Sequence, residues 1–197
     1  MKKVFLAVFL LAVLAVPSYA DIGLRIGGSL DVATKFKTTV SYMGISADAD
    51  VDFDPGFSLH AAFAPFITDD QAIRLGGGLS YWIPRSGENT VDVSNLTFYA
   101  TSLIYPGRFG GGDLGLYGKV NLGYNLPNFE GDDEGFFKGG FYFGLGLGFE
   151  FAENFFVEGL FGRYGISIKD DPDDPMPDGM SIKSRFTTFH IGFGFKF

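Results

Sequence analysis

The feature that most constrains this chain is an alternation of apolar with small or polar residues that recurs eight times. Successive side chains of a β-strand point to opposite faces, so a two-residue period predicts strands. The most regular segment runs from Phe141 to Phe151, where aromatic and leucine side chains alternate with small or polar ones. The eight segments lie at about 22–32, 57–64, 73–83, 93–105, 114–124, 141–151, 155–168 and 182–197. We therefore expect an all-β fold.

The first twenty residues follow a different pattern. Lys2 and Lys3 precede an uninterrupted apolar run, Val4–Val16, and the segment ends in a small-x-small sequence at Ala20. This order is typical of a secretory signal peptide that is cleaved after Ala20. A helix of that length would rise only about 20 Å, whereas the hydrocarbon core is about 30 Å thick. We therefore predict a signal peptide over residues 1–20 and one exported domain over residues 21–197.

Composition removes several classes of partner and cofactor. The net charge of −8 and the sequence pI of about 4.6 leave no excess of Lys and Arg. Binding to a phosphate backbone requires such an excess, so nucleic acid is not an expected partner. The chain contains no cysteine, which excludes disulfide scaffolds, thiol catalysis and cysteine-ligated metal centres.

The face opposite the apolar residues decides between a soluble and a membrane barrel. A soluble barrel carries several charges per strand on its second face, but here that face is mostly Gly, Ser, Ala, Thr and Tyr. Glycines inside a narrow barrel leave room for Trp82, Tyr99, Tyr117 and Tyr142. Short connections also alternate with longer acidic ones, as in outer-membrane proteins. We therefore predict an eight-stranded antiparallel up-and-down transmembrane β-barrel with its apolar face toward lipid.

The end of the chain carries a more specific signal. Apolar residues occupy every second position up to the terminus, namely Phe189, Ile191, Phe193, Phe195 and Phe197. This spacing resembles the C-terminal signature of bacterial outer-membrane β-barrels, which the assembly machinery reads. The mature chain as a whole is similar to the small OmpA/OmpX-like outer-membrane barrel superfamily. The resemblance implies a monomer in the bacterial outer membrane that contacts lipid and lipopolysaccharide and is inserted by the barrel assembly machinery.

Four charged residues have the parity of the lumen and lie near the short-turn end of their strands. They are Arg25, Arg74, Glu150 and Glu158. An unpaired charge is very costly in a space that excludes bulk water, so opposite charges at one level should pair. We predict a salt-bridge plug at this level, with His60, Lys119 and His190 above it.

Ser58 and His60 lie two residues apart on one predicted strand, so both side chains point the same way. Lipid A deacylases of the PagL type resemble this arrangement, with a His and a Ser on one strand. Here the order is reversed, no carboxylate follows in register to orient the imidazole, and parity places both residues in the lumen. We therefore interpret the pair as structural and assign no catalytic residues and no enzymatic activity.

An acidic run, Asp48, Asp50, Asp52 and Asp54, precedes Gly56. An EF-hand needs Gly at its sixth position and Glu at its twelfth, whereas these places hold Phe and Leu. Read as a strand, the carboxylates share one face and continue the inward parity of the segment that follows. No cofactor or bound metal is predicted from this run, although a loose divalent-cation site remains an alternative.

Uninterrupted alternation would extend the first two strands into a long hairpin beyond the bilayer. A two-residue turn at 44–45, with Gly in its first position, fits a type II′ geometry. This register places Lys37 opposite Asp52 and leaves Asp48 and Asp50 uncompensated, so any cation site would centre on these two carboxylates. The hairpin edge would be available to a partner through strand addition.

Three functions are compatible with these observations. The first is a structural or surface-interaction role through the extracellular loops, and the second is small-molecule binding or slow passage through the lumen. The third, a lipid-modifying enzyme, depends on Ser58 and His60 alone. An eight-stranded barrel is filled by its own side chains, so a general diffusion pore is excluded.

Overall fold

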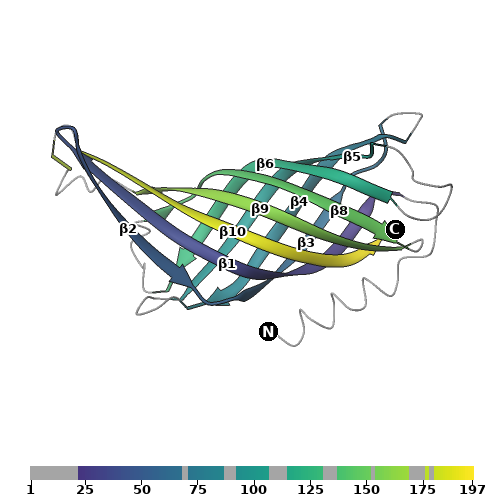
Figure 1. The fold of residues 1–197 in the computed structure, drawn as a ribbon, viewed down its shortest axis with the longest axis horizontal. Helices are drawn as coiled ribbons and strands as arrows, with labels where there is room; N and C mark the ends of the chain where they lie inside the picture. Colours follow the sequence, from purple (N-terminus) through teal and green to yellow (C-terminus); the bar gives the residue numbers. More distant parts are fainter. Residues whose placement is uncertain are drawn as a thin grey trace.

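The computed structural model of the chain consists of antiparallel strands (Figure 1). It describes residues 22–67, 71–86, 92–106, 115–130, 137–151, 154–168, 176–177 and 180–197. The strands are β1 (Leu24–Tyr42), β2 (Ile45–Phe53), β3 (Gly56–Phe63), β4 (Ile73–Arg85), β5 (Val93–Ile104), β6 (Gly115–Phe129), β7 (Phe137–Lys138), β8 (Gly140–Phe151), β9 (Phe155–Ile168) and β10 (Met180–Lys196). Within these ranges no helix has the length and apolarity needed to cross a membrane. The predicted signal peptide lies outside the described residues.

Eight of these strands close into a ring in the order β1, β3, β4, β5, β6, β8, β9 and β10, and β10 pairs back onto β1. This ring confirms the eight-stranded up-and-down barrel. β2 also pairs with β1 and precedes β3 along the chain, whereas β7 pairs with β9. At the seam, Leu24 and Phe197 exchange two backbone hydrogen bonds of 3.2 and 2.8 Å. Closure leaves the ring without a free edge.

Side chains alternate across the wall as the sequence predicts. Leu147 and Phe141 on β8, for example, are 67% and 63% exposed, whereas Tyr142 and Glu150 on the same strand are buried. The apolar outer band would be unfavourable in water, at about 25 cal/mol per Å² of exposed apolar surface. The band therefore matches the hydrocarbon region of a bilayer.

Inward-facing glycines make space for the large aromatic side chains of the lumen. A Cβ atom added at Gly148 would lie 2.1 Å from the Tyr117 ring, and one at Gly78 would lie 2.8 Å from the Tyr99 ring. Any larger residue at these two positions would displace the neighbouring ring. The prediction that small inner residues accommodate these tyrosines is confirmed.

β1 and β2 form a long hairpin that projects to the left in Figure 1, and the first part of β10 extends with it, paired with β1 as far as Tyr42. The prediction that its charged residues face inward is wrong. A bulge between Asp31 and Ala33 shifts the register of β1, so that Thr34 rather than Lys35 is buried. The returning chain makes a matching change at residues 54–55, between Phe53 and Gly56, both of which are buried. One unpaired residue in a strand exchanges its two faces, so the lysines and aspartates of the hairpin lie on its outer face.

The turn of this hairpin also differs from the prediction. Met43 and Gly44 form the two-residue turn, both with positive φ, which is the geometry of a type I′ turn. Tyr42 therefore pairs with Ile45, and the ladder places Lys37 opposite Asp50 rather than Asp52. Type I′ turns match the right-handed twist of the flanking strands, so the position of this turn sets the register of the whole hairpin.

Candidate functional site

Buried polar side chains fill the half of the lumen near the C-terminus. Arg25 Nη1 lies 2.5 Å from Glu150 Oε1, and Lys196 Nζ donates to Glu150 Oε2 at 2.7 Å. The Tyr105 hydroxyl donates to Glu150 Oε1, also at 2.7 Å. Three donors from three segments of the chain therefore converge on one buried carboxylate.

Glu158 forms the second carboxylate of this cluster. Lys119 Nζ donates to its Oε1 at 2.6 Å, and the Tyr117 hydroxyl donates to its Oε2 at 3.0 Å. Arg25 Nη2 is 3.9 Å from the same Oε2, so one guanidinium serves both glutamates. Arg25, Tyr117, Lys119 and Glu158 form one group with Glu150, Tyr105 and Lys196, which we call the lower cluster. Because these side chains are buried, removing the partner of any charge in the cluster would leave an unpaired charge and destabilise the barrel.

Arg74 lies beside the lower cluster rather than within its ion pairs. Its guanidinium stacks over the Phe66 ring, 3.8 Å from the centroid, and lies 5.9 Å from the centroid of Tyr105. Its Nη1 also donates to the Ala64 carbonyl at 3.4 Å. The structure thus joins three of the four predicted plug residues directly, and Arg74 adjoins them through the Tyr105 ring.

A second buried centre surrounds Asp31 of β1. The carboxylate accepts the Ser58 hydroxyl at 2.6 Å and is contacted by Arg85 and by Nδ1 of His190. Because a carboxylate can only accept, Nδ1 carries a proton, and Nε2 lies 2.9 Å from the Tyr164 hydroxyl. Side chains of β1, β3, β4 and β10 therefore meet at one charged group.

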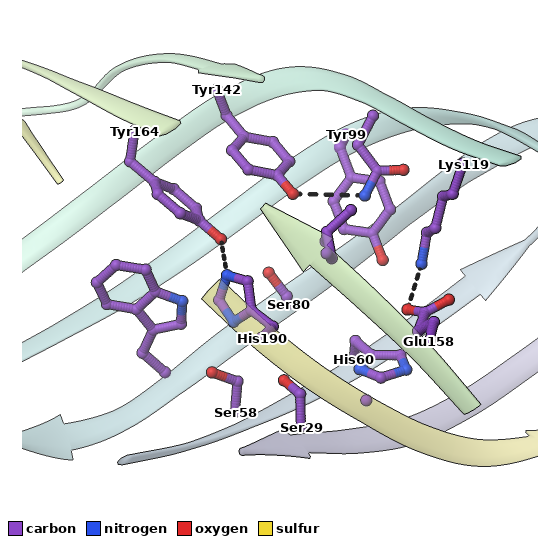
Figure 2. Close-up of a pocket in the computed structure, with 14 residues that line it drawn as sticks. Ser29, Ser58, His60, Ser80, Tyr99, Lys119, Tyr142, Glu158, Tyr164 and His190 are labelled. Carbon is purple, nitrogen blue, oxygen red and sulfur yellow. Dashed lines mark hydrogen bonds and ion pairs between the residues drawn. The ribbon is translucent and has the colours of Figure 1, made fainter. Parts of the chain in front are cut away.

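A small cavity separates this centre from the lower cluster (Figure 2). Its volume is about 30 Å³, and His60, Ser80, Asn121 and Glu158 are among the residues that line it. Two buried polar atoms, His60 Nε2 and Asn121 Oδ1, have no hydrogen-bond partner within the described chain. A cavity of this size accommodates a water molecule and excludes larger solutes.

Aromatic rings pack beside the Asp31 centre, and three of them, Trp82, Tyr142 and Tyr164, also line the cavity. Trp82 packs edge-on against Tyr164 and Phe186, at centroid distances of 4.7 and 5.4 Å. Tyr142 stacks on Tyr164 at 4.5 Å. Trp82, Tyr142, Tyr164 and Phe186 are at most 2% exposed. We call these four buried rings the aromatic layer.

The structure gives Ser58 and His60 separate roles. The Ser58 hydroxyl donates its proton to Asp31, so this proton is not directed at an imidazole base. His60 packs against the Phe156 ring, with centroids 5.8 Å apart, and faces the cavity beside Glu158 (Figure 2). In this geometry His60 does not accept the Ser58 proton, so the two side chains do not form a nucleophile and base pair.

In the observed register of the hairpin, Asp48 and Asp50 have lysine partners, which the predicted register did not give them. Lys37 contacts Asp48, which also accepts the Thr39 hydroxyl at 2.7 Å, and Lys35 Nζ lies 3.5 Å from Asp50. Donation from Lys37 and Thr39 holds the pKa of Asp48 below its ordinary value. Within the described part of the chain, no group of three or more His, Asp and Glu residues could hold a metal ion. The expectation that Asp48 and Asp50 are uncompensated is therefore wrong.

The C-terminal aromatic residues lie on the lipid side of β10. Phe189, Ile191, Phe193 and Phe195 are between 39% and 58% exposed. Phe197 closes the seam through its backbone bonds to Leu24. The predicted assembly signal is thus an outward-facing row on the strand that completes the ring.

Sequence reasoning missed Arg85 and Lys196. The predicted third strand ended before Arg85, and a register shift between Trp82 and Arg85 turns both side chains inward, although they are three residues apart. Lys196 is the penultimate residue, and it reaches Glu150 from the edge of the lumen. For Asp31, the inward parity was visible in the sequence, but its partners come from strands far away in the chain.

A closed ring of eight strands, an apolar outer band and a filled polar lumen define an outer-membrane β-barrel. The family model for the outer membrane protein beta-barrel domain matches residues 4–197. The chain therefore belongs to this family and lies in the bacterial outer membrane.

Solved structures share the fold at low sequence identity. Neisserial surface protein A is 14% identical with a TM-score of 0.52, over 91% of this chain and 100% of that one. Outer membrane protein OprG from Pseudomonas aeruginosa is 15% identical with a TM-score of 0.44, over 90% and 99%. The outer membrane protease OmpT from Escherichia coli is 11% identical with a TM-score of 0.44, over 93% and 99%. A sequence comparison with curated proteins gives no match.

Proposed function

We propose that this protein is a small outer-membrane barrel that acts through its projecting sheet in surface interaction, and that it is neither a general pore nor an enzyme. The filled lumen supports the exclusion of a general pore, because the lower cluster, the Asp31 centre and the aromatic layer together occupy it and leave between them a cavity of about 30 Å³. The proposal that the protein is not an enzyme is supported by the Ser58 hydroxyl, which donates to Asp31 rather than to an imidazole base. The observation that carries the proposal is the hairpin of β1 and β2, which extends beyond the barrel (Figure 1).

The free edge of β2 is the feature best suited to binding. Among the described strands, β2 pairs only with β1, so its other edge presents unpaired backbone groups. Such an edge accepts an additional strand from a partner. Its outer face carries Asp48, Asp50 and Asp52, whereas Ala47, Ala49 and Val51 lie on the other face. Two copies of β2 paired antiparallel would bring carboxylates close together, which disfavours self-association through this edge.

A parity-preserving deletion tests this function. Removing residues 38–41 together with 46–49 shortens the hairpin by four pairs and keeps both the turn and the alternation. The probe is a fluorescent peptide of alternating lysine and valine, added to cells that carry either form. We expect binding to the full hairpin and its loss from the short one, with heat-modifiable migration unchanged. Equal binding to both forms contradicts the proposal.

A second candidate function, binding or slow passage of a small polar molecule in the lumen, is favoured by His60 Nε2 and Asn121 Oδ1, which have no hydrogen-bond partner within the described chain. The cavity of about 30 Å³ restricts such a molecule to the size of water unless the aromatic layer moves. Conductance across planar bilayers distinguishes the two functions. A stable single-channel current favours slow passage, and a silent bilayer favours the surface role.

A further inference from the structure

The cavity in the lumen is lined by residues of both buried charged centres. In Figure 2, Lys119 and Glu158 of the lower cluster lie to the right of the cavity, whereas Ser58 and His190, which contact Asp31, lie to the left. Among the described residues, no hydrogen bond or ion pair joins one centre directly to the other. A molecule in the cavity would therefore be the contact between them.

Three residues that line the cavity have unused hydrogen-bonding capacity. His60 Nε2 and Asn121 Oδ1 have no partner within the described chain, and these side chains belong to residues that are only 9% and 1% exposed. The Lys119 ammonium has three N–H groups and donates one of them to Glu158. Lys119 and Asn121 are two residues apart on β6, so their side chains enter the lumen at adjacent levels. The three groups therefore border the same small space.

These donors and acceptors define the kind of molecule that fits. The Asn121 oxygen only accepts, so the molecule must donate a proton to it, which a bare anion cannot do. The remaining N–H groups of Lys119 require an acceptor, which excludes a metal or ammonium cation. The volume of about 30 Å³ exceeds the 10–15 Å³ that one water molecule needs and is far below the 300–1,000 Å³ of ordinary small-molecule sites. Water meets all three conditions.

We propose that the cavity holds water bound to Lys119, Asn121 and His60, and that this water joins the lower cluster and the Asp31 centre into one hydrogen-bond network. Buried water typically makes about three hydrogen bonds, the number that these groups supply. The Ser58 hydroxyl donates to Asp31 and keeps lone pairs that can accept from the same water. This inference deepens the second candidate function, because it rests on binding in the lumen and names the bound molecule. A silent bilayer in the conductance measurement bears on passage and not on this site.

Hydroxyl-radical footprinting by X-ray radiolysis tests the site in the detergent-solubilised barrel, because radicals that form at a bound water modify the side chains beside it. We expect Tyr142, which lines the cavity, to be modified. Tyr117 is equally buried but does not line the cavity, so it should stay unmodified. Equal modification of the two tyrosines, or of neither, would overturn the proposal.

The role of Asn121 is tested by Asn121→Leu, which removes the acceptor and places an apolar side chain of similar size at the cavity. Modification of Tyr142 should then be lost. Asn128→Leu, the same change at an exposed position of β6, is the matched control and should leave the modification unchanged. Persistence of the modification in Asn121→Leu would overturn the assignment. If Asn121→Leu does not fold, water-selective NMR of the unaltered chain in micelles decides: a cross-peak between water and the His60 ring supports the site, and its absence overturns it.

A double-mutant cycle tests the link between the two centres. Lys119→Met and Ser58→Ala are made singly and together, and the unfolding equilibrium constant of each variant is measured in urea. Residues that share no partner have additive effects, so the double variant would then show the product of the two single changes. With water shared between them, we expect a departure from that product of more than about two-fold. Additive effects would overturn the link.

Discussion

Arg25 of β1 and Glu150 of β8 meet in the lumen, 2.5 Å apart, although β9 and β10 separate their strands in the ring. Lys196 of β10 and Tyr105, which follows β5, contact the same carboxylate. The lower cluster therefore connects distant parts of the wall from inside, where backbone ladders connect only neighbours. Removing one partner from such a pair destabilises a protein by about 3–5 kcal/mol.

We predict that Glu150→Ala lowers the free energy of unfolding in micelles by about 3 kcal/mol, because it removes the carboxylate that pairs with Lys196 and is nearest to Arg25. The single tryptophan, Trp82, reports unfolding in urea through its fluorescence. Phe151→Ala, which alters an exposed neighbour, is the control and should change stability far less. Replacing Glu150 and Glu158 together should lower the melting temperature further. An unchanged melting temperature with unchanged conductance would exclude a plug.

Asp31→Asn should destabilise the barrel more than Ser58→Ala. The first change leaves the buried Arg85 guanidinium without its counter-charge, whereas the second removes one neutral donor to a carboxylate that retains Arg85 and His190. The expected difference is about 2 kcal/mol, measured by urea unfolding of both variants. Equal losses would show that Asp31 is not the centre of this network.

The observed hairpin register can be tested by disulfide formation, since the chain has no native cysteine. Lys37→Cys with Asp50→Cys should cross-link on oxidation, because directly paired strand residues lie about 4.5–5.5 Å apart. Lys37→Cys with Asp52→Cys should not, because diagonal positions are about 7–8 Å apart. Cross-linking of the second pair alone would restore the register expected from a turn at 44–45.

The Asp48 carboxylate should become protonated only at a lower pH than an ordinary aspartate. Its pKa is lowered in the folded hairpin, so its interaction with Lys37 and Thr39 is complete above the unfolded pKa and is lost as the pH falls through the folded value. Carboxyl carbon shifts measured by NMR should give Asp48 a midpoint below that of a model peptide. Lys37→Met should move the midpoint upward. An unchanged midpoint in that variant would exclude the ion pair in solution.

Deleting Phe197 should reduce the amount of folded barrel in the outer membrane. The terminal residue closes the seam with Leu24 and ends the outward-facing row that the assembly machinery is expected to read. Heat-modifiable migration of membrane fractions measures the folded amount, and refolding in micelles measures intrinsic stability. Assembly should fall while refolding in micelles persists. A parallel loss in both would assign Phe197 to stability alone.

Local pattern alone was sufficient to predict the barrel. Alternation from Phe141 to Phe151 fixes which side chains face lipid, because strand geometry gives every second residue the same direction. The inward direction of Arg25, Glu150 and Glu158 follows from the same rule, as does the outward row ending at Phe195. Neither inference requires knowledge of which strands are neighbours.

Only the tertiary structure determined the faces of the hairpin, the position of its turn and the partners of Asp31, which the alternation of residues does not predict. The bulge after Asp31 and the change at residues 54–55 exchange the inner and outer faces of the hairpin. A bulge adds one residue without interrupting the strand, so the alternation in the sequence does not reveal it. The choice of Met43–Gly44 over residues 44–45 for the turn depends on the twist of the paired strands. The partners of Asp31 depend on closure of the ring, because Ser58, Arg85 and His190 reach it from other strands. The sequence by itself determined the direction of each regular strand, and only closure and the bulges determined which charges meet.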